Sequence, residues 1–245
     1  MLFRSGDEVD HGAGDVARYT NAPTGVVIYP YDSESNFIAE NDGYGDTDTL
    51  KSIEYIYGSK HADSLYAGGL DVIFEGAAGN DFIDGGLSGD SQNESGTWET
   101  AGISYYGADS GVDINFSGMT AYDAQITISH EYDGNTYTDT VKGVDALAGS
   151  QHADSIIGHD QIPNSITGLA GADTLDGGSI EGYSWNEVFY VGDGGQGINL
   201  AYNPESHSGY ATDSWGDTDN LYNFNLFVGS EHNDTFNLEG SNTNA

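Results

Sequence analysis

The sequence repeats itself, and this repeat limits what the chain can fold into more than any other feature does. Three similar segments, each starting 86 residues after the previous one, mark the copies: GVVIYPY from Gly25, GVDINFS from Gly111 and GINLAYN from Gly197. A second marker in each copy is an aspartate ten residues before a Gly-Ser pair: Asp48, Asp139 and Asp219. A repeat of this kind indicates an array of similar structural units. We therefore divide the 245 residues into units 1–98, 99–186 and 187–245, of which the third is incomplete.

A shorter period of nine residues runs inside the units. Residues 58–66, 67–75 and 76–84 are three consecutive nonapeptides, and the second unit repeats them with one inserted residue. One apolar residue recurs in each of them: Leu65, Phe74, Ile83, Ile156, Ile166 and Leu175. A single buried residue per nonapeptide predicts a very short strand after a long turn rich in glycine and aspartate. Because sustained helical periodicity is absent, the sequence predicts an all-β fold.

Two of the nonapeptides contain a recognisable motif. GAAGNDFIDGG at 76–86 and GLAGADTLDGG at 168–178 resemble G-G-x-G-x-D-x-U-x, the calcium-binding nonapeptide of the RTX (repeats-in-toxin) family. The segments VARYTNAPTGVVIY and ISYYGADSGVDINF also resemble stretches interleaved with such repeats in bacterial proteins exported by type I secretion. The resemblance implies a parallel β-solenoid, or β-roll, with glycine- and aspartate-rich turns and longer inserted loops. One inserted loop is predicted to be a hairpin with its turn at Asp133-Gly134.

The resemblance also implies where calcium binds. In the RTX family two nonapeptides complete one coil, so turns on one side recur after two nonapeptides. Asp63 and Asp81 are 18 residues apart, and Asp154 and Asp173 are 19 apart because of the inserted residue. We expect Ca²⁺ between the members of each pair, held by both carboxylates and by backbone carbonyls. The turn glycines are expected to adopt positive φ and to leave these carbonyls accessible: Gly58, Gly76, Gly79, Gly149, Gly168 and Gly171.

Further acidic residues are candidates of less regular spacing. They are Asp7, Asp90 and Asp234 in or beside partial nonapeptides, and Asp46, Asp48, Asp217 and Asp219 in two matching acidic segments. These segments, DGYGDTD at 42–48 and DSWGDTD at 213–219, place three carboxylates in seven residues. Each segment either holds another cation or only forms a turn, and the sequence leaves both open. On the opposite side of the coil, with Asp71, Asp90 and Asn164 among its turn residues, we expect weak sites or none.

Composition also favours bound cations. The 40 acidic and 5 basic side chains give a net charge of −35, so a compact state works against its own repulsion. Leu, Ile, Val and Phe make up only 48 of the 245 residues, so apolar burial alone is not expected to hold the fold. The absence of cysteine leaves oxygen ligands, which suit Ca²⁺. So few basic residues argue against nucleic acid and anionic membrane surfaces as partners, and the absence of a long apolar stretch argues against membrane insertion.

Three histidines recur at one position of the copies, in GS-x-H-x-D: His61, His152 and His232. One histidine per copy forms no cluster for zinc, which needs three or four ligands together, so we expect these rings to pack at a turn. No nucleophile elbow, HExxH motif or phosphate-binding loop is present. The sequence therefore does not predict an enzyme.

The resemblance implies a function outside the cell. An RTX module folds on extracellular Ca²⁺ and acts as a structural, adhesin or surface-assembly segment of a secreted bacterial protein. A carbohydrate-binding accessory module of a secreted polysaccharide-active enzyme is the alternative. The expected partners, besides calcium, are other copies of the chain or a polymer at the cell surface. The first twenty residues lack the pattern of a Sec-type signal, and partial nonapeptides at both ends predict a piece of a longer array.

Overall fold

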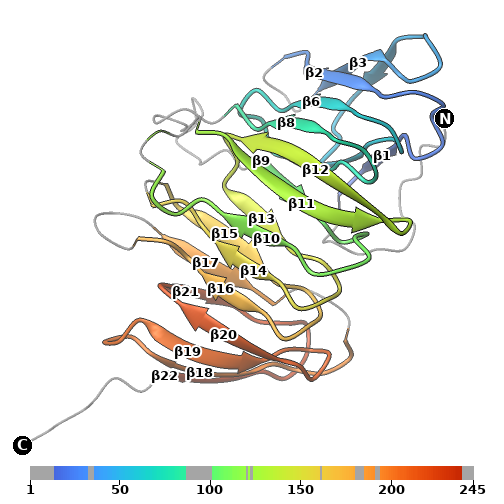
Figure 1. The fold of residues 1–245 in the computed structure, drawn as a ribbon. Coiled ribbons are helices and arrows are strands. Elements are labelled where there is room, and N and C mark those ends of the chain that lie inside the picture. The colour runs from blue at the N-terminus through green and yellow to red at the C-terminus, as the bar shows by residue number, and fades with distance from the viewer. Residues whose placement is uncertain are drawn as a thin grey trace, which may run out of the picture.

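The computed structural model describes residues 14–32, 36–86, 101–119, 121, 124–160, 162–179, 185–190 and 194–238. Within these ranges the protein is all-β, as predicted, and contains no helix. The strands follow one another as a stack, from the first copy in blue at one end to the third copy in red at the other (Figure 1). The candidate ligands Asp7 and Asp90 lie outside the described residues.

One face of the stack is a long parallel sheet, in which every neighbouring pair of strands is parallel. Its strands, in spatial order, are β1 (Val16–Arg18), β5 (Tyr55–Tyr57), β7 (Val72–Glu75), β9 (Ala101–Ser104), β13 (Ala146–Ala148), β15 (Asn164–Thr167), β17 (Asn186–Phe189) and β21 (Leu226–Val228). The sheet runs through all three copies without interruption. Strand β17 spans the expected boundary between the second and third units.

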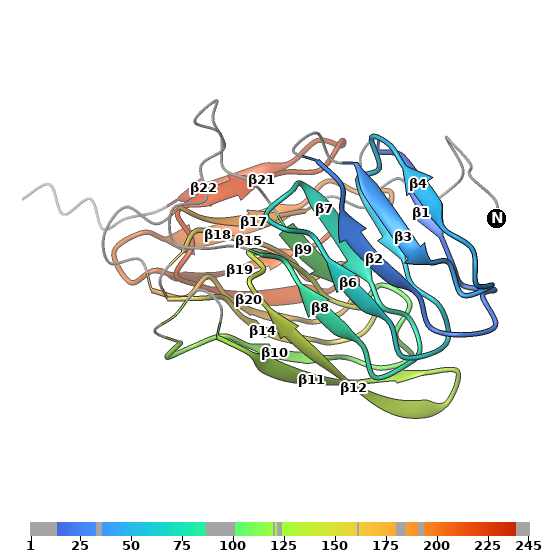
Figure 2. The same ribbon diagram turned by 90° about the horizontal axis from the view of Figure 1, so that it is seen from above.

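The other face consists of two mixed sheets, which Figure 2 shows from above. The N-terminal mixed sheet has the order β11 (Ile126–Tyr132), β12 (Asn135–Lys142), β8 (Phe82–Asp84), β6 (Ser64–Tyr66), β2 (Val27–Pro30), β3 (Phe37–Asn41) and β4 (Asp48–Leu50). The C-terminal mixed sheet has the order β10 (Asp113–Asn115), β14 (Ser155–Ile157), β16 (Thr174–Asp176), β20 (Thr218–Tyr222), β19 (Ser208–Thr212), β18 (Asn199–Asn203) and β22 (Thr235–Leu238).

Consecutive nonapeptide strands alternate between the two faces. Strands β5 and β7 belong to the long parallel sheet, whereas β6 and β8 belong to the N-terminal mixed sheet. Strand registers follow the period of two nonapeptides: Leu65 lies opposite Ile83, 18 residues later, and Ile156 lies opposite Leu175, 19 residues later. The turn that precedes each of these strands therefore stacks on the turn two nonapeptides away.

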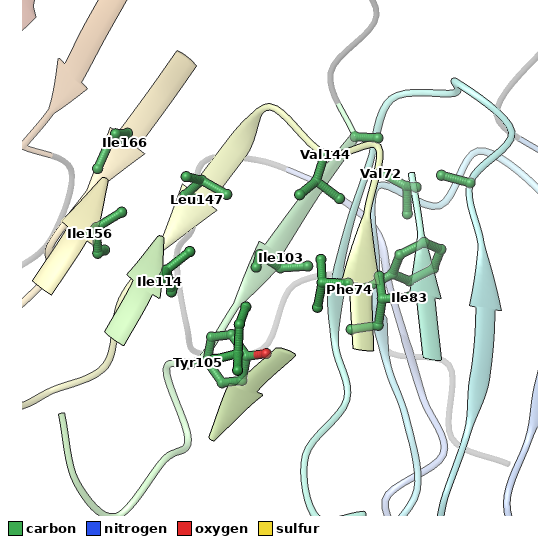
Figure 3. Packing of buried hydrophobic residues seen from close by; sticks show 14 of the residues in the cluster. Val72, Phe74, Ile83, Ile103, Tyr105, Ile114, Val144, Leu147, Ile156 and Ile166 are labelled. Atoms are coloured by element: carbon green, nitrogen blue, oxygen red, sulfur yellow. The ribbon is translucent and has the colours of Figure 1, made fainter. Parts of the chain in front are cut away.

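The core lies between the two faces and contains the apolar residue of each nonapeptide. All six predicted core residues are at most 1% exposed: Leu65, Phe74, Ile83, Ile156, Ile166 and Leu175. In the three-residue strands β6, β8 and β14 only the central side chain is buried. Figure 3 shows Ile114 and Ile156 of the C-terminal mixed sheet alongside Leu147 and Ile166 of the long parallel sheet. The prediction of one buried residue per nonapeptide is confirmed.

Each copy also inserts three strands into the mixed face. In the first and third copies these strands form antiparallel meanders, β2–β3–β4 and β18–β19–β20. In the middle copy, β11 and β12 form the predicted hairpin, with Asp133 and Gly134 at positive φ in its turn. The last inserted strand pairs with the nonapeptide strand of the preceding copy, as β12 does with β8 and β20 with β16. The insertions thereby join consecutive copies.

Only glycine fits at the positions that mark the copies, for a steric reason. A Cβ on Gly25, Gly111 or Gly197 would overlap the carbonyl oxygen of Ala62, Ala153 or Asn233 respectively. Backbone from two distant segments meets at each of these points, so a side chain has no room there. The spacing of 86 residues reflects this contact, which recurs once in each copy.

Candidate metal centre

The structure brings the predicted ligands of the first copy together in one buried column. The carboxylate of Asp63 accepts the amide N–H of Val26 through Oδ1 at 2.7 Å and that of Ser59 through Oδ2 at 2.6 Å. Asp81 Oδ1 in turn accepts the amide N–H of Asp63 at 2.8 Å. Both aspartates are 2% exposed. The 18-residue spacing therefore corresponds to direct stacking of one aspartate on the next.

A third aspartate, which spacing within the nonapeptides did not predict, extends this column. Asp139 Oδ1 accepts the amide N–H of Asp81 at 2.9 Å, and its Oδ2 accepts the hydroxyl of Tyr105 at 3.0 Å. Asp139 comes from the inserted strand β12 and is fully buried. The sequence did contain a signal for it, since Asp139 belongs to the second marker of the copies.

The second copy repeats the column. Asp154 Oδ1 accepts the amide N–H of Val112 at 2.7 Å, and Asp173 Oδ1 accepts that of Asp154 at 2.8 Å. Asp219, on the inserted strand β20, accepts the amide N–H of Asp173 at 2.9 Å. In the third copy, Asp234 Oδ1 accepts the amide N–H of Ile198 at 2.9 Å, which is the first step of the same pattern.

The turn glycines surround these carboxylates in two different ways. A Cβ on Gly58, Gly76, Gly149 or Gly168 would overlap the Oδ2 atom of the aspartate five residues later in the same turn. Only Gly79 and Gly171, at φ +140° and +125°, have the expected positive φ. The expectation of positive φ is therefore wrong for the four glycines that open the turns. They make room for a carboxylate instead.

Two kinds of turn differ in how completely they satisfy the aspartate. In the turn 58–63, Ser59 donates both its amide and its hydroxyl to Asp63. In the turn 76–81 the corresponding residue is Ala77, at φ +66°, and Asp81 Oδ2 is buried without a hydrogen-bond partner. The turn 168–173 has Leu169 at φ +69°, and Asp173 Oδ2 is likewise unpartnered. The turns with an unpartnered oxygen are the two that match the RTX motif.

Burial makes these carboxylates costly to ionise. Desolvation, with added repulsion from Asp139 and Asp63, raises the pKa of Asp81 to about 9. Desolvation, with repulsion from Asp219 and Asp154, raises the pKa of Asp173 to about 8. Without a cation, both side chains would hold a proton at neutral pH. A bound cation would remove this repulsion and supply a partner for each unpartnered oxygen.

The donor set fits calcium better than zinc. Among the described residues, no three side chains of His, Asp or Glu converge to form a metal site by themselves. A cation would therefore need backbone carbonyls as well, which Ca²⁺ accepts and Zn²⁺ rarely uses. The carbonyl of Gly76 faces Gly58, and that of Gly168 faces Gly149, so carbonyl oxygens lie beside both aspartate pairs.

In the second copy, the opposite side of the stack contains an amide where the main columns contain carboxylates, whereas nearer the first copy Asp145 Oδ1 accepts the amide N–H of Ala101 at 3.1 Å. Asn164 Oδ1 accepts the amide N–H of His159 at 2.7 Å, as the aspartates do in the main columns. Its Nδ2 donates to the carbonyl oxygens of His159, Ile162 and Gly177 at 2.8–2.9 Å. The two N–H groups of this amide already donate to carbonyl oxygens that a cation would otherwise bind. Around Asn164, this arrangement favours the expectation that the opposite side binds calcium weakly or not at all.

The aspartates of the two acidic segments differ in how far they are buried. Asp46 and Asp217 are exposed, Asp48 is half-buried, and Asp219 is buried.

The imidazoles of His61, His152 and His232 are all exposed, so the expectation that they pack at a turn is wrong. At these positions the backbone makes the recurring contact, since the amide N–H of His61 donates to Ser59 Oγ at 3.0 Å.

Comparison with known proteins adds no assignment. A scan against protein-family models gives no match, and a search of curated proteins gives none either. The likeness to RTX repeats therefore depends on the turn residues themselves. Among the described residues, no helix is long and apolar enough to span a membrane.

Proposed function

We propose that this chain is a calcium-binding structural module of the RTX type, which folds as a parallel β-solenoid when Ca²⁺ enters its stacked turns. The observation that carries the proposal is the pair of buried, unpartnered carboxylate oxygens, Asp81 Oδ2 and Asp173 Oδ2. Each lies in an RTX-like turn stacked on a second aspartate. The alternation of strands between two faces, with registers of 18 and 19 residues, supports the solenoid.

The role proposed for the module is mechanical and not catalytic. Copies joined by continuous strand pairing form a stack whose length depends on the number of copies. Such a stack suits a spacer, adhesin or surface-assembly segment of a protein secreted by a type I system. Low calcium inside the cell would keep the acidic chain unfolded for export, and calcium outside would fold it.

Asparagine substitutions test the turn sites. Asp81→Asn keeps the Oδ1 acceptor of the column but replaces the unpartnered oxygen by an amide, as Asn164 does on the opposite side. We expect this variant to lose the calcium site of the first copy and to keep that of the second, because the two columns have no aspartate in common. Asp173→Asn is expected to give the reverse result. Calorimetric titration of both variants with Ca²⁺ provides the measurement, and a wild-type stoichiometry in both would refute the turn sites.

A carbohydrate-binding module remains the second candidate because of one hollow on the surface. Trp185, which is 64% exposed, lines it together with Asn164, Glu187 and Asp145. An exposed ring beside amide and carboxylate groups can stack on a sugar while its neighbours bind the hydroxyls.

The test of this candidate is a glycan-binding screen with Ca²⁺ present. If the hollow binds a glycan, Trp185→Ala should lower its affinity at least about fivefold, since aromatic contacts contribute about 1 kcal/mol or more. Tyr44→Ala removes an equally exposed ring away from the hollow and serves as the control. Binding that survives Trp185→Ala would exclude this hollow.

A further inference from the structure

The inserted strands place one buried aspartate at the same point in the second and third copies. Asp139 lies opposite Ile128 in the pairing of β11 with β12, and Asp219 lies opposite Ala211 in the pairing of β19 with β20. Both aspartates are fully buried, and each accepts the amide N–H of an aspartate in the adjacent nonapeptide turn. Their surroundings can therefore be compared position by position.

In the middle copy, a histidine stands beside this aspartate. His130 lies on β11, two residues after Ile128, and its Nε2 is 3.2 Å from Asp139 Oδ2. Both side chains are 1% exposed. The Nε2 atom forms no hydrogen bond at this distance, and the imidazole occupies the space beside the carboxylate without adding a second acid.

In the third copy, the same position holds a second acid. Asp213 lies two residues after Ala211 and is 1% exposed. Its Oδ1 accepts the amides of Trp215, Gly216 and Asp217 at 2.7–3.0 Å, which fixes its orientation. Its Oδ2 is buried without a hydrogen-bond partner, and Asp219 Oδ2 is buried with the hydroxyl of Tyr190 as its neighbour.

Two buried acids therefore replace the acid and imidazole of the middle copy. Burial raises the pKa of Asp219 to about 7, and the charge of Asp213 adds to this effect. Among the described residues, neither Asp213 nor Asp219 forms an ion pair with a basic side chain, whereas Asp139 has His130 beside it.

We propose that Asp213 and Asp219 hold a divalent cation of the calcium type between the meander of the third copy and the turn 168–173, and that His130 takes the place of this cation in the middle copy. The remaining ligands would be backbone carbonyls and water, which Ca²⁺ accepts. This site lies outside the nonapeptide turns, so it extends the proposed function and can stand or fail independently of the turn sites.

Exchange of the two residues tests the proposal in the full chain, with Ca²⁺ alone as the probe. Asp213→His should reduce the calorimetric stoichiometry by one ion per chain, because the new imidazole can pair with Asp219. Asp213→Asn should have the same effect without adding a charge. His130→Asp should increase the stoichiometry by one ion, because it recreates the acidic pair beside Asp139. The control is Asp133→Asn, which removes an exposed acid from the same hairpin as His130. Asp133 pairs with Lys60, so this variant should bind as many calcium ions as the wild type.

An unchanged stoichiometry in Asp213→His and Asp213→Asn would overturn the site, and no gain in His130→Asp would overturn the role of His130. These outcomes differ from failure of the turn sites. If Asp81→Asn and Asp173→Asn bind as many ions as the wild type but Asp213→Asn binds one fewer, the turn sites are refuted and the present site stands.

Discussion

At about pH 8 in a chelator, the protein is expected to give the circular dichroism spectrum of a disordered chain, and millimolar Ca²⁺ is expected to convert it to that of a β protein. The net charge of −35 opposes a compact state, and the columns bury several carboxylates against one another. Each site that exists only in the folded state stabilises it by about 2.7 kcal/mol at a hundredfold excess of Ca²⁺ over Kd, so two sites contribute roughly 5 kcal/mol. This is comparable to the stability of a typical domain.

Magnesium is the control for this experiment. Mg²⁺ carries the same charge, but it demands a tighter octahedron and retains its waters, so it should restore much less β structure. Equal restoration by both ions would indicate screening of the net charge and not specific sites. A full β spectrum in chelator, unchanged by Ca²⁺, would mean that the apolar core holds the fold alone.

Acid is expected to replace calcium in part. In chelator, folded structure should appear as the pH is lowered from about 8 to about 5, and its thermal midpoint should rise as the pH falls further within that range. The pKa values of Asp81, Asp173 and Asp219 in the folded protein are raised to about 9, 8 and 7, above the unfolded value near 4. Between these limits the folded state holds protons that the unfolded state releases, so stability falls as the pH rises. Each such group contributes a slope of up to about 1.4 kcal/mol per pH unit.

Two conditions separate this effect from general charge repulsion. The double variant Asp81→Asn, Asp173→Asn removes two of the titrating groups and changes the net charge by only two, so its midpoint in chelator should depend less on pH. Saturating Ca²⁺ should also flatten the dependence in the wild type, because the ion needs the deprotonated carboxylates. Thermal melts followed by circular dichroism provide the measurement. A slope in the double variant equal to that of the wild type would show that the columns do not cause it.

The repeat period predicted the parts of the fold that depend on local sequence. One apolar residue per nonapeptide predicted the short strands and core residues such as Leu65 and Ile83, because a three-residue strand can bury only its central side chain. The 18-residue interval between Asp63 and Asp81 predicted that their turns are stacked. The turn residues Asp133-Gly134 predicted the hairpin of the middle copy.

Only the tertiary structure decided what surrounds each carboxylate. Asp139 and Asp219 join the columns 58 and 46 residues along the chain from the aspartates they contact, because the inserted strands return beside the preceding copy. The two kinds of turn, and the placement of His130 and Asp213 at equivalent points, became visible only from strand register. A period in the sequence determines which residues share a face. Whether a buried oxygen finds a donor depends on backbone and side chains from distant segments, and only the folded chain brings those together.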